Sequence, residues 1–240
     1  MKTVRPCLRR EAWLVLAALG FSTAALAGRG TWAEALDQMP IASGVTQLNR
    51  SNCVSVLLNA FSSNDVAKAL VFLPGAIDEL YLFRSVQVDL AKSAPTLLGA
   101  IGAMTNQSRI GVTFRPPFLL LHSTGDRLDP LSKIEHARTA DHLHQARFLP
   151  FIEYQDRDWD SIQPGLKRVL KMDLQPWRFS PESWHFYRHN FAAWNLTDWE
   201  ALEATALAGK TGFIIRHRQV IFVPDRRTRA APHLEGYPRD

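Results

Sequence analysis

The stretch of sequence that decides the fold is TDWEALEATALAGKTGFIIRHRQVIFV, residues 197–223. It opens with a capping box, because Thr197 and Glu200 stand three residues apart before an apolar run. The hydroxyl of Thr197 can accept the backbone N–H of Glu200, while the carboxylate of Glu200 reaches back to that of Thr197. Trp199, Leu202 and Ala206 then fall on one helical face. The stretch therefore predicts a helix that follows Thr197 and is closed by the glycines at 209 and 212.

Two strands follow this helix, at 213–215 and 220–223, around a turn at 216–219. Before the helix, 185–193 favours a further strand. The same order occurs about 100 residues earlier. Apolar residues alternate over 86–90 and 110–114, as in half-buried strands, and 95–104 has helical spacing after a proline. The continuous apolar run at 118–121, after Pro116-Pro117, indicates a strand buried on both faces.

The sequence thus predicts an α+β chain with two βαββ-type units, Val86–His122 and Phe186–Val223. The alternative is that strand–helix–strand–strand order arises twice by chance. Additional helices are expected before and between the units, at 31–39, 53–61, 129–148 and 158–171, with Ser51-Asn52 as a cap for the second. For 65–73 a helix and a buried strand over 69–73 both remain open, because periodicity does not separate them.

The first 27 residues have the order of a secretory signal peptide. A basic head precedes an apolar run over 12–19, and Ala25-Leu26-Ala27 supplies small residues before Gly28. We expect cleavage between Ala27 and Gly28, and a periplasmic or secreted protein that is exported by the Sec or the twin-arginine route. The expected divisions are the leader (1–27), an N-terminal α+β unit (28–125), a helical connector (126–180), a C-terminal βαββ unit (181–225) and a flexible basic tail (226–240).

Charge and cysteine content exclude several classes of protein. The whole chain has 28 Lys+Arg and 23 Asp+Glu, and loss of the leader leaves 24 and 22. This balance gives no case for a nucleic-acid partner, which would need a clustered basic face. Cys7 leaves with the leader, so Cys53 remains and no internal disulfide can form. We expect Cys53 to be buried, with pairing between chains as the alternative.

The second unit resembles a known class of module. Trp199 to Ala204, then Gly209 to Phe213, then Val220 to Phe222 look like the short N-terminal modules of secretins and TonB-dependent receptors, called STN-like domains. The stretch from Pro95 to Leu121 is similar but has no Gly at the end of its helix. The resemblance implies a periplasmic module for protein interaction or signalling. Because no barrel or secretin sequence follows, it implies a free-standing module.

Residues 204–211, ATALAGKT, match a loose phosphate-binding loop around Lys210, and GKTG at 209–212 matches the loop of KH modules. A phosphate loop needs a strand before it and a helix after it, and here the predicted order is reversed. Lys210 is more simply a cation at a helix C-terminus. We therefore expect no nucleotide cofactor and no nucleic-acid site.

Two sets of polar residues are candidates for chemistry. The run Phe118–Asp126 is similar to the acid-bearing loop of α/β-hydrolases, with Asp126 or Asp129 as acid and His185 or His189 as base, yet no G-x-S-x-G elbow occurs. A possible metal set does not share one helical face, so no metal site is expected. That set comprises His136, Asp141, His142 and His144.

The sequence therefore favours an exported, non-enzymatic interaction or envelope-associated module, with catalytic residues unknown and no cofactor or metal. Its partner is expected to be another envelope or secreted protein, and the mature chain carries no integral membrane segment. Oligomeric state stays open. The alternative is an exported hydrolase whose site uses His122, Asp126 or His185.

Overall fold

The computed structural model describes residues 32–62, 64–73, 83, 86–90, 96–107, 109–124, 143, 149–176, 188–216 and 219–224. A short helix spans 32–37. The elements that follow are β1 (Gln47–Asn49), α2 (Cys53–Ala60), β2 (Ala69–Phe72), β3 (Gln87–Asp89), α3 (Leu97–Gln107), β4 (Ile110–Arg115), β5 (Phe118–Ser123), β6 (Leu149–Arg157), α5 (Trp159–Leu170), β7 (Asp173–Pro176), β8 (His189–Leu196), α6 (Asp198–Ala208), β9 (Thr211–Arg216) and β10 (Gln219–Pro224).

These elements form one topology twice. β1-α2-β2-β3-α3-β4-β5 is followed by β6-α5-β7-β8-α6-β9-β10. The pairings repeat too: β1 with β3 and β6 with β8 are antiparallel, β2 with β5 and β7 with β10 are parallel, and β4-β5 and β9-β10 are antiparallel hairpins. We call β1 to β5 repeat 1 and β6 to β10 repeat 2. The predicted α+β class with two βαββ-type units is confirmed, and each unit is part of a larger repeat.

The second part of each repeat matches residue for residue. α3 and α6, β4 and β9, and β5 and β10 each begin and end 101 positions apart. The capping box predicted at the start of α6 is present: Thr197 accepts the N–H of Glu200 at 3.1 Å, and Glu200 accepts the N–H of Thr197 at 2.8 Å. The helix and the two strands that follow it thus have equal lengths and equal spacing in both repeats.

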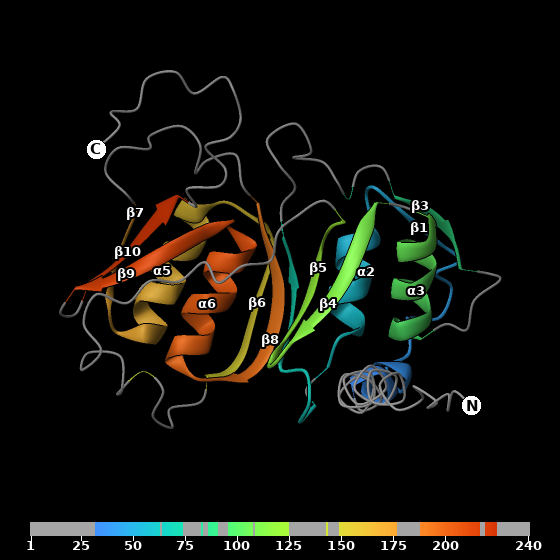
Figure 1. The fold of residues 1–240 in the computed structure, drawn as a ribbon, viewed down its shortest axis with the longest axis horizontal. Helices are drawn as coiled ribbons and strands as arrows, with labels where there is room; N and C mark the ends of the chain where they lie inside the picture. The colour runs from blue at the N-terminus through green and yellow to red at the C-terminus, as the bar shows by residue number, and fades with distance from the viewer. Residues whose placement is uncertain are drawn as a thin grey trace, which may run out of the picture.

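The repeats join edge to edge. β2 of repeat 1 pairs antiparallel with β8 of repeat 2, which gives a central five-stranded sheet of order β4-β5-β2-β8-β6. α6 lies between this sheet and the three-stranded sheet of repeat 2 (Figure 1). Two ion pairs tie α6 to repeat 1, Lys68 to Glu200 at 3.5 Å and Arg115 to Glu203 at 2.7 Å. We call the β2·β8 pairing and the contacts of α6 with repeat 1 the seam.

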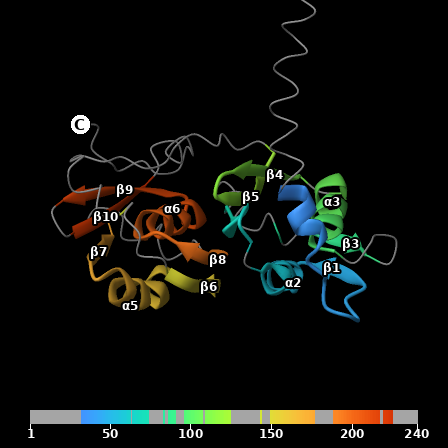
Figure 2. The ribbon, with the colours of Figure 1, turned by 90° about the horizontal axis from the view of Figure 1, so that it is seen from below.

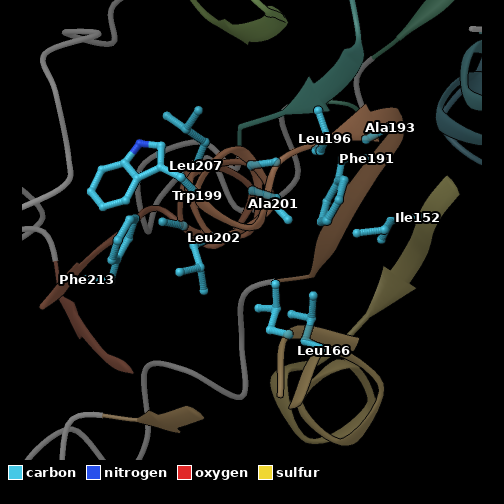
Figure 3. Close-up of a cluster of buried hydrophobic side chains, with 14 of the residues drawn as sticks. Ile152, Leu166, Phe191, Ala193, Leu196, Trp199, Ala201, Leu202, Leu207 and Phe213 are labelled. Carbon is cyan, nitrogen blue, oxygen red and sulfur yellow. The ribbon is translucent and has the colours of Figure 1, made fainter. Parts of the chain in front are cut away.

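The central sheet separates two hydrophobic clusters. One lies on the side of α2 and α3, and the other on the side of α5 and α6, as the view from below shows (Figure 2). The second cluster draws side chains from β6, β8, α5, α6 and β9, among them Ile152, Phe191, Leu166, Leu202 and Phe213 (Figure 3). Eight of the 11 residues of α6 are buried, because the helix is covered on both sides.

The structure decides between the two interpretations of 65–73. Residues 69–72 form strand β2, and all four are buried because β5 and β8 flank the strand and both faces are covered. The predicted helices at 53–61 and 158–171 correspond to α2 and α5. Asn52 is the N-cap of α2, but its side chain makes no capping bond and instead accepts the N–H of Asn49.

Two sequence-based expectations need correction. The predicted strand at 185–193 is β8, His189–Leu196, which runs directly into the N-cap of α6. The predicted helical connector over 126–180 also contains strands β6 and β7, because β6 pairs with β8 as the outer strand of the central sheet. The predicted leader (1–27), the basic tail (226–240) and, apart from residue 143, the helix at 129–148 lie outside the described residues. Within the described part, no helix is long and apolar enough to cross a membrane.

Candidate functional site

Two histidines lie in one row across the central sheet. Leu121 of β5 and Asn190 of β8 are both register partners of the same β2 residue. The next position along the strands therefore places His122 and His189 on either side of Leu73. Adjacent strands lie about 4.8 Å apart, so the two Cα atoms are separated by about 10 Å. Strand alternation directs both imidazoles to the side of the sheet that α6 covers.

The imidazole of His122 is held by two polar contacts. Its Nδ1 lies 2.7 Å from the carbonyl oxygen of Ser123, and because a carbonyl only accepts, Nδ1 carries the proton and donates. Nε2 lies 2.9 Å from the hydroxyl oxygen of Thr113. Gly111 is the register partner of His122, and a Cβ there would come within 3.1 Å of the ring, so the glycine makes room for it.

His189 lies in a drier environment, with a relative exposure of 2%. Burial lowers the pKa of His189 to about 4, although the backbone of Arg157 and the charge of Asp158 act in the opposite direction. Among the described residues Nδ1 has no hydrogen-bond partner. Nε2 faces Gly209, where a Cβ would lie 2.5 Å away. His189 is therefore a neutral core residue at pH 7.

Thr113 is the polar residue that sequence reasoning missed. Its hydroxyl, the His122 ring and the Ser123 carbonyl form the order of hydroxyl, base and orienting acceptor that activates a nucleophile in hydrolases. The β4-β5 hairpin positions the pair, because residues 113 and 122 are diagonal neighbours on one face. The sequence predicts the strand at 110–114 and the turn at the prolines. The contact between Thr113 and His122 could not be predicted without the residue pairing of the β4-β5 hairpin.

Thr113, His122 and His189 are described, whereas most of the predicted acids and histidines lie outside the described residues. Those outside are Asp126, Asp129, His136, Asp141, His142, His144 and His185. Within the described ranges, no three His, Cys, Asp or Glu side chains gather in a way that could hold a metal ion.

Lys210 does not sit in a phosphate-binding arrangement. Helix α6 precedes it and strand β9 follows it, the reverse of the order that such a loop needs. Lys210 has a positive φ of 51° at the end of α6, and the hydroxyl of Thr211 donates back to the carbonyl of Ala206. The motif is thus a helix C-terminus.

Cys53 is buried, as predicted, at the start of α2. Its Sγ lies 3.5 Å from the carbonyl oxygen of Phe83. Burial raises the pKa of the Cys53 thiol to about 11, so the thiol stays protonated at neutral pH. The residue packs as a small apolar side chain.

A surface on repeat 2 differs from its counterpart on repeat 1. Ile214 of β9 and Ile221 and Val223 of β10 are only partly buried and point away from the core cluster beneath their sheet. We call these three residues the outer face. Their matches 101 positions earlier are Thr113, Leu120 and His122, on the sheet face that α6 covers. In repeat 1 helix α6 covers this face of the sheet, whereas in repeat 2 no described helix covers the outer face.

Comparison with known proteins gives no relative: no protein-family model, curated protein or solved structure matches this chain.

Proposed function

We propose that this chain is an exported, non-enzymatic interaction module of the cell envelope, periplasmic or secreted, whose outer face binds a protein partner. The observation that carries the proposal is the contrast between the repeats. In repeat 1 Leu120 and His122 are buried on the sheet face that α6 covers, whereas in repeat 2 the matching residues Ile221 and Val223 are partly exposed. Apolar sheet faces with a polar rim are typical of protein-binding surfaces.

The rim of the outer face supports this role. Asp173 and Gln175 of β7 and Gln219 of β10 lie on the same side of the sheet and are partly exposed. Gln175 and Gln219 both donate to Asp173 Oδ2, at 2.8 Å and 3.2 Å, which fixes the rim in place. A hydrogen bond from Lys167 contributes most to the lowered pKa of Asp173, and the bonds from Gln175 and Gln219 lower it further. The carboxylate therefore stays charged beside the apolar centre.

Two features of the sequence also support an exported module. The leader pattern at 1–27 accounts for the export, and the resemblance of Trp199 to Phe222 to STN-like modules supports binding to an envelope protein. The order strand, helix, strand, strand in each βαββ unit agrees with that resemblance. Because His189 is neutral and buried, it offers no reactive group to a substrate.

The proposal is tested by photocrosslinking in the native host. A photoreactive residue at Ile221 should give a defined crosslinked product in the exported fraction, and one at Arg168, exposed on α5, should not. The mature chain should begin at Gly28 by mass spectrometry. An uncleaved chain that stays in the cytoplasm would refute export, and equal crosslinking at both positions would refute the outer face as the binding site.

A second candidate function, an exported hydrolase, is favoured by one observation, the bond between Thr113 and His122. On this account the Thr113 hydroxyl attacks a carbonyl and His122 takes its proton. Hydrolysis of p-nitrophenyl esters would then fall at least 100-fold in Thr113→Val and in His122→Gln, with correct folding checked by circular dichroism. His189→Gln serves as the control. Equal turnover in all variants would remove this candidate.

A further inference from the structure

We infer that the partner of the outer face is a second copy of this chain, which supplies the exposed side of α3 and the edge of β3, so that copies associate head to tail. This inference rests on the proposed interaction role and names its partner. The chain itself provides the template, because the seam already joins one repeat to the next in this way.

The seam shows what covers a sheet of this type. In repeat 1 the edge strand β2 pairs with β8, and α6, which follows β8, lies across the face of β2 and β5. The elements of repeat 2 that match this sheet are β7, β10 and β9. Among the described strands β7 pairs with β10 alone, so no described strand pairs with its second edge, and β2 would be in the same position without the seam.

Repeat 1 carries the surface that matches β8 and α6. The equivalents are β3 and α3, and among the described strands β3 pairs with β1 alone. α3 contains no charged residue, although it lies at the periphery of the molecule (Figure 1). Leu98, Gly99, Gly102 and Ala103 are partly exposed on it, and a Cβ at Gly102 would meet no atom within 4 Å. We call these four residues the α3 face.

The α3 face fits the outer face in chemistry. In α6 the matching positions hold Glu200 and Glu203, which pair with basic residues of repeat 1. In α3 they hold Gly99 and Gly102, so a helix without charge would meet a sheet whose centre is Ile214, Ile221 and Val223. Small residues allow the close approach of a helix to a sheet, and apolar burial supplies the driving force.

The edge of β7 limits how the copies meet. Pro176 has no backbone N–H, which removes one donor from the four-residue strand. Backbone pairing between β7 and a second β3 is therefore short, and the contact of the α3 face with the outer face must carry most of the binding. Because the two surfaces differ, the contact is heterologous, and it builds open or ring-shaped assemblies rather than closed twofold dimers.

Complementary variants test the inference by sedimentation velocity on the purified protein. Wild type should show association that grows with concentration beyond a dimer. Ile221→Lys disables the outer face and Gly102→Arg disables the α3 face, so each variant alone should be monomeric. Their equimolar mixture should form a 1:1 dimer and stop, because one intact surface remains on each. Ser161→Lys, on the exposed side of α5, should associate as wild type does.

Each result supports or overturns the inference. Circular dichroism checks folding, and Ala103→Lys replaces Gly102→Arg if that variant unfolds. A wild-type protein that stays monomeric, or a mixture that gives no dimer, overturns it. Self-association of Ile221→Lys overturns it as well. A monomeric protein that still crosslinks through residue 221 in cells would overturn the second copy as partner and leave the interaction role intact.

Discussion

Thr96 and Thr197, which stand 101 positions apart, cap equivalent helices with the same hydrogen bond. The hydroxyl of Thr96 accepts the N–H of Gly99 at 3.1 Å, and that of Thr197 accepts the N–H of Glu200 at 3.1 Å. From these residues onward the helix and the two strands of each repeat have equal lengths and equal spacing. The equivalent helices of the two repeats therefore begin with the same capping residue and the same hydrogen bond.

The two caps should contribute to stability by similar mechanisms. Thr96→Ala and Thr197→Ala should each lower the free energy of unfolding by about 1 kcal/mol, because a helix N–H loses its acceptor. The loss at Thr197 should be larger, since Glu200 closes the capping box there. Urea denaturation measures both. Thr105→Ala, within α3, is the control and should change stability by less; equal losses at all three sites would contradict the role of the caps.

Two glycines should respond in opposite ways to the same change. Gly209→Ala should destabilise the fold by roughly 1–3 kcal/mol, because the new methyl group would overlap His189 Nε2 at 2.5 Å. Gly102→Ala should stabilise it by about 0.5–1 kcal/mol, since the site is open and alanine favours a helix. Thermal melts of both variants decide the matter, and a stabilising Gly209→Ala would show that His189 lies elsewhere.

The buried His189 should make the fold sensitive to mild acid. Its folded pKa is about 4 against an ordinary 6.5, so the unfolded chain takes up the proton first as pH falls. Stability from this group is complete above pH 6.5 and declines down to about pH 4, by on the order of 3 kcal/mol. His189→Gln should flatten this part of the profile in urea melts. An unchanged profile in the variant would assign the pH dependence to other groups.

The Cys53 thiol should report global unfolding. Because burial raises its pKa to about 11 and closes access, the native protein should not react with a thiol reagent such as Ellman's reagent at pH 8. In denaturant, the leaderless chain should release one equivalent. Rapid reaction of the native protein would show that α2 is loosely packed on repeat 1.

Many of the helices and strands could be predicted from local patterns in the sequence. The capping box, the alternation at 86–90 and 110–114, and the turn at 216–219 lie close together along the chain, so they identify elements without knowledge of their partners. At 69–73 five apolar residues fit a helix and a buried strand equally, and only the flanking strands β5 and β8 decide.

Long-range pairings were not accessible in the same way. The alternation of 149–157 is broken at Ile152 and by a bulge between Tyr154 and Arg157, so β6 resembled part of a helical connector. The Thr113–His122 bond depends on hairpin register, and the burial of His189 depends on α6 ending above it at Gly209. Each requires packing between distant segments.

The seam is the feature on which the two-repeat account depends. Hydrogen exchange at the amides of β2 and β8 measures it directly, because β2 is an inner strand only while the repeats are joined. The account predicts that the amides of Leu70, Val71 and Phe72 exchange as slowly as the slowest in the protein, at the rate of global unfolding. Fast exchange in β2, with the β4-β5 hairpin still protected, would contradict it.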